Sequence, residues 1–240
     1  MKELKDFLYY HEDGPPTIDI YCGDCLEIMP LLPKVDLVVT SPPYNKNGAE
    51  SGGNWKPKEW YADSMSDVDY VAWQRKCLNQ MLDTAKVVCY NNKITYRDGL
   101  VLFPHRILGG MPVRQEVIWD RGSTPDVSNG KYLPVDERIF ILAHDSWAFL
   151  DRKRPLTTIY RDTTWIGNTK NDHPAPFPDR LPKKFIEEIK SDTVLDPFLG
   201  SGTTIVACKE LKRNGIGIEI NEKYCEIAKK RLMNTQVPFL

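Results

Sequence analysis

The chain of 240 residues is predicted to fold as an α/β protein with a mostly parallel, doubly wound sheet and an antiparallel edge hairpin. Short apolar runs of strand length alternate with helical patterns, which is typical of strand-helix-strand repeats. Several of these runs end in a carboxylate or a stiff turn. The clearest is 193–204 (TVLDPFLGSGTT), which predicts a buried strand, a glycine turn and a helix start. The carboxyl ends of such strands are where open α/β sheets bind ligands.

Length and charge place few demands on partners. A mass of 27.6 kDa suits one domain, expected to span 1–240. The net charge is -1 with a pI near 6.4, so any nucleic-acid surface has to be a local patch. No apolar run of spanning length, signal peptide or targeting tail is recognised. We therefore expect a cytoplasmic protein without a membrane partner.

The cysteines predict neither disulfides nor a metal centre. Six of them are scattered along the chain, which favours reduced core thiols. Cys22 and Cys25 have CxxC spacing, but no second pair or suitable histidine cluster accompanies them. We expect no bound metal.

The first predicted strand, 17–22, stops at Gly23-Asp24, and a short helix over 25–32 follows. Asp24 is therefore expected at the carboxyl end of a strand. Two interpretations stay open for its side chain: it binds a ligand there, or it caps the helix.

The next predicted strand, 35–40, runs into Ser41, Pro42, Pro43 and Tyr44. Two prolines cannot continue a ladder, so a stiff extended turn must leave the sheet. Without N–H groups of their own, the prolines leave carbonyls free as acceptors, while Ser41 adds an oxygen and Tyr44 a flat face. A planar ring with an exocyclic amine would find acceptors and a stacking partner here. The alternative is an ordinary rigid loop.

Residues 46–66 combine glycine, lysine and aromatic residues without periodicity. A loop of this length is usually a lid or a binding loop, and its cations and rings suit contact with phosphates and bases. The alternative is a loop whose Trp residues only anchor it to the core. Asp67 is expected to cap the following helix, which leads to a strand over 85–90.

The middle of the chain predicts the antiparallel edge of the sheet. A helix is expected around 98–108, and strands over 112–119 and 133–142 are expected to pair near one another. The basic run 151–155 is either a solvated surface or a phosphate-facing segment.

Proline stiffens the segment 173–178 and excludes a helix there. His173 is a possible ligand or base, although a histidine without a partner is more often structural. Asp179 is expected to cap the next helix. After the glycine turn we expect a helix over 203–211, a strand over 215–220 and a closing helix that ends near 233.

Gly200 and Gly202 would let the backbone come close to a ligand, and free N–H groups at a helix start favour negative groups. No Gly-Lys-Ser/Thr follows, so the turn is not a P-loop. Asp196 closes the strand before this turn, and Glu219 closes the next one. In such a strand-helix-strand unit, an acidic residue at the end of the second strand is expected to hold a pair of ribose hydroxyls. The alternative is an ordinary strand-to-helix turn.

Taken together, Ser41-Pro-Pro-Tyr44 and Asp196-Pro-Phe-x-Gly-Ser-Gly202 resemble the motifs of DNA amino-methyltransferases that use S-adenosylmethionine. The resemblance extends over about 18–232. It implies a Rossmann-like class I methyltransferase fold. Because the catalytic motif precedes the cofactor motif, the chain is similar to the β class, in which the sheet is circularly permuted.

The resemblance also implies the site. The catalytic residues would be Ser41, Pro42, Pro43 and Tyr44. S-adenosyl-L-methionine would be held by Asp24, His173, Pro174, Phe177, Asp196, Phe198, Gly200, Ser201, Gly202, Thr203 and Glu219. Within this set, Glu219 matches the acid on the ribose, Asp24 the carboxylate near the adenine, and 173–178 the segment at the methionine end.

The implied substrate is a base flipped out of double-stranded DNA, methylated on its exocyclic amine. Serine before Pro-Pro-Tyr favours N4 of cytosine, with N6 of adenine as the alternative. An RNA methyltransferase and an inactive binding module are further alternatives. The 46–66 loop and the 121–172 region are candidate DNA-facing inserts, although the stretch between the antiparallel edge and His173 is short for the recognition region of this family. A homodimer and a cognate restriction endonuclease are possible partners.

Overall fold

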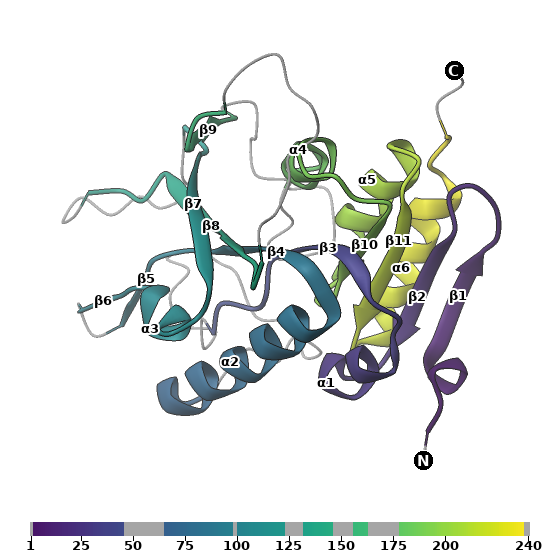
Figure 1. Cartoon of the computed structure of the whole chain (residues 1–240), viewed down its shortest axis with the longest axis horizontal. Coiled ribbons are helices and arrows are strands. Elements are labelled where there is room, and N and C mark those ends of the chain that lie inside the picture. Colours follow the sequence, from purple (N-terminus) through teal and green to yellow (C-terminus); the bar gives the residue numbers. More distant parts are fainter. Residues whose placement is uncertain are drawn as a thin grey trace.

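The structure is a computed structural model and describes residues 2–45, 65–97, 100–122, 132–145, 156–162 and 178–237. The described part of the chain contains a nine-stranded sheet with the strand order β1-β2-β11-β10-β3-β4-β8-β7-β9 (Figure 1). Its strands are β1 (Leu8–Glu12), β2 (Ile18–Cys22), β3 (Val35–Thr40), β4 (Ala85–Asn92), β7 (Val113–Asp120), β8 (Asp136–Leu142), β9 (Ile159–Arg161), β10 (Thr193–Asp196) and β11 (Asn214–Glu219).

The five strands β2, β11, β10, β3 and β4 are parallel to one another. Strand β8 runs antiparallel to β4 and β7, and β1 runs antiparallel to β2. The predicted α/β class and the antiparallel pairing of the strands over 112–119 and 133–142 are confirmed. Since β8 lies inside the sheet, part of the 121–172 region belongs to the framework of the fold.

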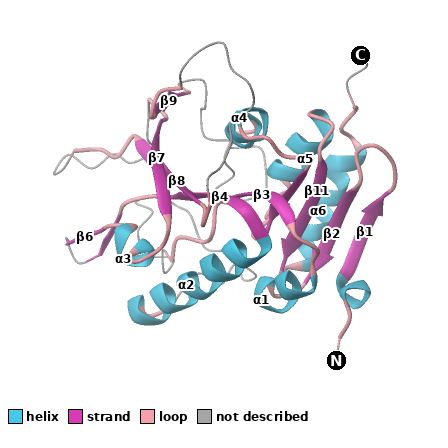
Figure 2. Cartoon of the chain, in the orientation of Figure 1, coloured by secondary structure: helices cyan, strands magenta, loops and turns pink. Residues whose placement is uncertain are grey.

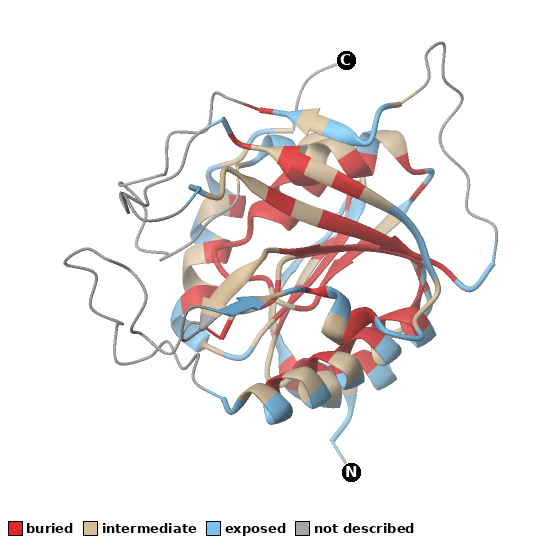
Figure 3. Cartoon of the chain, turned by 90° about the vertical axis from the view of Figure 1, so that its left-hand side faces the viewer, coloured by how far each residue is buried: buried red, intermediate tan, exposed pale blue. Residues whose placement is uncertain are grey.

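Helices cover both faces of the sheet (Figure 2). They are α1 (Cys25–Ile28), α2 (Asp67–Thr84), α3 (His105–Leu108), α4 (Arg180–Glu188), α5 (Thr203–Glu210) and α6 (Glu222–Met233), with 3-10 turns at Leu4–Phe7 and Met29–Leu31. Alternation along β3 assigns the faces: Leu37 and Val39 pack in the cluster with α4, α5 and α6, while Val38 packs in the cluster with α1, α2 and α3. Both faces of the central strands are therefore buried (Figure 3).

The centre of the sheet contains a topological switch point. From β10 the chain passes through α5 to β11 on one side, and from β3 it passes through α2 to β4 on the other, over the opposite face. Strands β10 and β3 are parallel neighbours, with Leu195 opposite Val38. Their carboxyl ends therefore meet at one edge, in the position where doubly wound sheets bind ligands.

The helix predicted around 98–108 is confirmed only at its C-terminal end. A two-stranded antiparallel sheet, β5 (Thr95–Arg97) and β6 (Leu100–Leu102), takes the first part of this segment. Among the described residues of this segment, only His105–Leu108 are helical. Pro104 stands at the N-cap, and the β-branched and aromatic residues before it favour extended backbone.

The cap predicted at Asp67 is wrong, and Asp179 takes the predicted N-cap position of α4 without a side-chain cap bond. Ser66 caps α2, because its hydroxyl accepts a hydrogen bond from the N–H of Asp69 at 3.2 Å, and Asp67 is the first helical residue. Asp179 precedes α4 but makes no cap bond. Its carboxylate instead accepts a hydrogen bond from Arg231 Nη2 at 3.3 Å, so a tertiary partner has replaced the local one.

All six cysteines are free thiols, and five of them are buried. None of the helices in the described ranges is long and apolar enough to cross a membrane.

Candidate active site

The buried carboxylate of Asp196 lies at the switch point and is 1% exposed. Its Oδ1 accepts hydrogen bonds from Thr40 Oγ1 at 2.7 Å and from the Phe198 N–H at 3.1 Å, and its Oδ2 accepts one from Thr204 Oγ1 at 2.7 Å. Burial raises the pKa of Asp196, and these hydrogen bonds oppose the rise. Asp196 therefore joins β10 to β3 and α5, and holds the predicted cofactor loop beside the predicted catalytic loop.

The glycine turn is shaped by α6 as well as by its position at the ligand edge. Gly200 and Gly202 have φ values of 51° and 87°, in the left-handed region that favours glycine. A Cβ atom on Gly202 would lie 2.7 Å from the Cβ of Ala228. Close packing of the start of α5 against α6 is therefore one reason why the second glycine is needed.

Arg231, on α6, binds this turn from behind. Its Nη1 donates to the carbonyl of Ser201 at 2.7 Å, to Ser201 Oγ at 3.0 Å and to Thr203 Oγ1 at 3.1 Å. The side-chain oxygens of Ser201 and Thr203 thus face Arg231, and both residues are buried. No local pattern marks Arg231 as a partner of the turn, because the two segments meet only through the packing of α6 on α5.

Glu219 ends β11 on the other side of the turn. Its Oε2 accepts a hydrogen bond from the Gly200 N–H at 2.8 Å, and its Oε1 accepts one from the Asn221 N–H at 2.9 Å. Burial raises the pKa of this carboxyl group, and the backbone donors oppose the rise. Each oxygen retains a lone pair, so the half-buried carboxylate can accept hydrogen bonds from two neighbouring hydroxyls. This donor and acceptor chemistry fits a ribose.

Asp24 follows β2, the next strand beyond β11. Its Oδ1 accepts a hydrogen bond from the Leu26 N–H at 2.8 Å, so the predicted N-cap is confirmed. The N–H of Gly23 donates to the carbonyl of Glu219 at 2.9 Å, which brings the two strand ends together. Asp24 and Glu219 therefore share the ligand edge of the sheet.

Phe198 lies half-buried after Asp196, and its ring meets the edge of Trp73 from α2 with centroids 5.6 Å apart. The predicted residues His173, Pro174 and Phe177 lie outside the described residues. So do 46–64, most of the predicted binding loop, and the basic run 151–155.

The predicted catalytic loop leaves β3 at the same edge. Ser41 Oγ and the hydroxyl of Tyr44 lie 2.7 Å apart. The expectation that both proline carbonyls are free is wrong for Pro43, whose oxygen accepts hydrogen bonds from Tyr70 OH at 2.9 Å and from Gln74 Nε2 at 3.3 Å. Helix α2 thus anchors the loop through that carbonyl.

Three polar residues that sequence reasoning missed surround the loop. Asn91 Nδ2 lies 3.4 Å from Ser41 Oγ, 3.1 Å from the Tyr44 hydroxyl and 2.9 Å from Glu137 Oε2. The Tyr44 hydroxyl also donates to Glu137 Oε2 at 3.1 Å, and Arg121 Nη1 lies 3.3 Å from Glu137 Oε1. The available signals were a carboxylate inside an apolar strand for Glu137, and a pair of Asn residues at the carboxyl end of another strand for Asn91.

The surroundings keep Tyr44 protonated. Burial and the charge of Glu137 raise the pKa of Tyr44 well above its ordinary value of 10.0. Lys93 Nζ lies 5.1 Å from the centre of the tyrosine ring, within the range of a cation-π contact. Tyr44 therefore presents a neutral, anchored ring.

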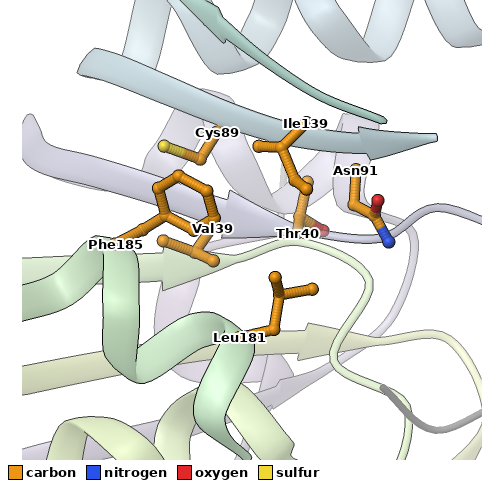
Figure 4. Close-up of a pocket in the computed structure, with 7 residues that line it drawn as sticks. All are labelled: Val39, Thr40, Cys89, Asn91, Ile139, Leu181 and Phe185. Atoms are coloured by element: carbon orange, nitrogen blue, oxygen red, sulfur yellow. The ribbon is translucent and has the colours of Figure 1, made fainter. Parts of the chain in front are cut away.

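A small hollow lies beside the catalytic loop, between the sheet and α4 (Figure 4). Its lining is mostly apolar and consists of Val39, Thr40, Cys89, Asn91, Ile139, Leu181 and Phe185. Asn91 is 4% exposed, and within the described ranges its Oδ1 has no hydrogen-bond partner. A buried acceptor in that state fits an incoming N–H or O–H donor.

This is an α/β protein with two loops and two buried or half-buried carboxylates at the switch point of its sheet, the position where doubly wound sheets bind ligands. The family model of the N6 and N4 DNA methylases, described as DNA methylase, matches residues 35–230. The chain therefore belongs to this family of DNA methyltransferases.

Individual relatives agree with that membership. The type II methyltransferase M.HpaI of Haemophilus parainfluenzae is 26% identical over 242 residues, which cover 89% of this chain and 73% of that protein. The solved structure of M1.HpyAVI with SAM is 26% identical, has a TM-score of 0.62, and matches over 90% of this chain and 100% of its own.

The solved PvuII DNA methyltransferase (cytosine-N4-specific) has a TM-score of 0.70 at 18% identity, over 92% of this chain and 94% of its own. At this identity it supports the fold alone. The M1.HpyAVI structure is a complex with SAM, so a relative of this chain binds S-adenosyl-L-methionine.

Proposed function

We propose that the protein transfers the methyl group of S-adenosyl-L-methionine to the exocyclic amine of a base flipped out of double-stranded DNA, and that this amine is N4 of cytosine. The observation that carries the proposal is the junction of the two loops. The Ser41–Tyr44 loop and the loop that begins at Asp196 leave neighbouring parallel strands and are joined by the Thr40–Asp196 hydrogen bond.

In this proposal the cofactor lies along the edge formed by β10, β11 and β2. Glu219 accepts hydrogen bonds from the ribose hydroxyls, and Asp24 lies near the adenine. Phe198 and the 200–203 turn line the cofactor site between Glu219 and the catalytic loop. The segment 173–178, with His173, Pro174 and Phe177, contacts the methionine end. The free lone pairs of Glu219 support this arrangement.

The bound cofactor would supply an electrophilic methyl group on a sulfonium. Transfer forms a bond from the methyl carbon to the amine nitrogen, breaks the carbon–sulfur bond to leave a neutral thioether, and releases one amine proton to solvent. An exocyclic amine is a poor nucleophile, because its lone pair is delocalised into the base ring. Ser41 Oγ and the Pro42 carbonyl oxygen accept hydrogen bonds from its two N–H groups. These hydrogen bonds localise the lone pair on the nitrogen and point it toward the methyl group. Orientation of this kind can lower the activation barrier by roughly 7–11 kcal/mol. Pro43 acts indirectly, since Tyr70 and Gln74 hold its carbonyl.

The target atom is inaccessible inside a duplex, so the base has to leave the helix. The ring of Tyr44 then stacks on the flipped base. Anchoring of its hydroxyl by Ser41, Asn91 and Glu137 supports this role, because the ring is held in place before the base arrives.

Serine before Pro-Pro-Tyr favours cytosine, and the PvuII enzyme that shares this fold is cytosine-N4-specific. N6 of adenine is the alternative target and requires no change in mechanism. An RNA methyltransferase or an inactive module that binds DNA would keep the fold and lose DNA methylation.

We further propose that the chain is one β-class domain over 1–240 with a circularly permuted sheet. The catalytic strand β3 precedes the cofactor strand β10 in the chain, which supports that order. The 46–66 loop and the surface part of 121–172 contact DNA, a homodimer supplies further recognition surface, and a restriction endonuclease of the same specificity accompanies the enzyme.

Nucleoside mass spectrometry tests the proposal. Duplex DNA is incubated with the protein and isotope-labelled S-adenosyl-L-methionine, with Ser41→Ala as the control. Labelled N4-methylcytosine supports the proposal, and labelled N6-methyladenine replaces the base while the mechanism stands. Cofactor binding without label on DNA, or label on RNA alone, overturns it.

A further inference from the structure

Glu137 lies under the catalytic loop although it belongs to β8, a strand far from the loop in sequence. Its partner strand is β4, where Asn91 is opposite Ile139, so Glu137 and Asn91 lie on the same face of the sheet. Glu137 is 7% exposed and has Arg121 as its counter-charge, with Nη1 3.3 Å from Oε1. The carboxylate is therefore held in place on the sheet, and its Oε2 accepts hydrogen bonds from both the Tyr44 hydroxyl and Asn91 Nδ2.

The directions of the hydrogen bonds follow from the chemistry of the groups. An ionised carboxylate can only accept, so the Tyr44 hydroxyl donates its single proton to Glu137 Oε2 at 3.1 Å. Asn91 presents Nδ2 to Glu137, Tyr44 and Ser41, because the reversed amide would place Oδ1 against the carboxylate. The tyrosine oxygen is therefore left with lone pairs only.

The same reasoning fixes the proton of Ser41. Its Oγ lies 2.7 Å from the Tyr44 hydroxyl, whose single hydrogen is already used in the hydrogen bond to Glu137. Ser41 must therefore donate to Tyr44, and its remaining lone-pair capacity is open to a new donor, since Asn91 Nδ2 is a long contact at 3.4 Å. An exocyclic amine, which offers N–H groups, requires an acceptor of this kind.

We propose that Glu137 is a positioning residue, which acts through Tyr44 to fix Ser41 as the hydrogen-bond acceptor for the target amine. This inference rests on the proposed amine methylation. Without the carboxylate, the Tyr44 proton can turn toward Ser41, and the serine proton then points at the amine. A donor facing another donor opposes both binding of the amine and localisation of its lone pair.

Glu137→Gln keeps the size of the side chain and removes its purely accepting character. If its NH₂ group faces Tyr44, the chain of hydrogen bonds reverses, and if it faces Arg121, two donors meet. We expect the single-turnover rate of methyl transfer to fall about 10- to 100-fold. The Kd for S-adenosyl-L-methionine should stay within about twofold, because Glu137 has no contact with the cofactor loop among the described residues.

Tyr44→Phe keeps the ring and removes the hydroxyl link, so it should also lower the rate. The double variant Tyr44→Phe/Glu137→Gln should be about as slow as Tyr44→Phe alone, because both changes cut one chain. Glu116→Gln is the matched control: Glu116 pairs with Arg138, the neighbour of Glu137 on β8, at 2.7 Å, and its loss should leave the rate unchanged.

The outcomes separate two failures. If the wild-type protein methylates no DNA or RNA amine, the proposed function fails first, and the inference fails with it. If the wild type is active and Glu137→Gln transfers methyl groups at the wild-type rate, only the inference is overturned. If Glu137→Gln loses its fold by circular dichroism, Tyr44→Phe decides, and a wild-type rate in that variant overturns the inference. Multiplicative effects in the double variant also overturn it.

Discussion

Thr40 Oγ1 donates a hydrogen bond to Asp196 Oδ1 over 2.7 Å and so joins the last residue of β3 to the last residue of β10. Both residues are 1% exposed. One of the two loops that follow begins at Ser41, and the other continues from Asp196. A buried side-chain hydrogen bond therefore adds to the backbone pairing of two parallel strands at the point where the proposed amine-binding loop and the proposed cofactor loop begin.

Thr40→Val should test this link. It keeps the shape of the side chain and leaves a buried carboxylate one donor short, which should cost about 1–3 kcal/mol of unfolding free energy in a urea titration. The rate of methyl transfer should also fall, on the order of 10- to 100-fold, because the two loops lose their fixed spacing.

Thr204→Val is the control for Thr40→Val. It removes the donor to Asp196 Oδ2, also at 2.7 Å, but leaves the Thr40–Asp196 bond in place. A similar loss of stability with a much smaller loss of rate is expected. Equal losses of rate in the two variants would show that the rate of transfer depends on the number of hydrogen bonds to the Asp196 carboxylate, and not on the link between the two strands.

Glu219→Gln should weaken cofactor binding, because hydrogen bonds to a charged acceptor contribute about 1.5–3 kcal/mol. This corresponds to a rise in the Kd for S-adenosyl-L-methionine of roughly 10- to 150-fold, measured by isothermal titration calorimetry. Glu222→Gln, on α6 close to this site, is a control that should bind normally. Unchanged affinity in Glu219→Gln would remove Glu219 from the cofactor site.

The pH dependence of cofactor binding should also report on Glu219. In the proposed site the ionised carboxylate accepts hydrogen bonds from the ribose hydroxyls, so its protonation should compete with binding. The pKa of Glu219 is raised above the ordinary value of 4.5, and the affinity should therefore fall with decreasing pH while the pH is still above 4.5. In Glu219→Gln this part of the pH dependence should vanish. A wild-type affinity that stays constant down to pH 4.5 would contradict the assignment.

Arg231→Ala should loosen the cofactor turn, because the guanidinium binds the carbonyl and hydroxyl of Ser201 and the hydroxyl of Thr203. We expect the Kd for S-adenosyl-L-methionine to rise about tenfold, with a loss of about 1–2 kcal/mol in unfolding free energy. Lys230→Ala, one position earlier on α6 with a side chain 68% exposed, is the control and should change neither quantity. A lower stability with normal cofactor affinity would limit Arg231 to a structural role.

Tyr44→Ala should reduce methyl transfer while cofactor affinity stays normal, because the ring is proposed to stack on the base. Stacking of a base on an aromatic side chain is worth about 1–3 kcal/mol, so the Kd for DNA with an abasic target position should change less than the Kd for intact DNA. Fluorescence anisotropy with both duplexes measures this. Unchanged turnover in Tyr44→Ala would exclude the stacking role.

The α/β class, the antiparallel edge and the loops at the candidate site could all be predicted from the sequence alone. Proline after 35–40 and glycine after Asp196 are local signals, since each residue type restricts or frees the backbone where it stands. Parallel strands then bring their carboxyl ends together by rule, so Ser41, Asp196 and Glu219 could be assigned to one edge without a three-dimensional structure.

The residues that surround those loops could be identified only from the three-dimensional structure. The capture of the Pro43 carbonyl by α2, the approach of Arg231 from α6 and the place of Glu137 under Tyr44 depend on helix packing and on the β4–β8 register. Such contacts join segments far apart in the chain, and they result from the packing of whole faces. No short stretch of sequence encodes them, which is why the loops could be predicted and the network that orients them could not.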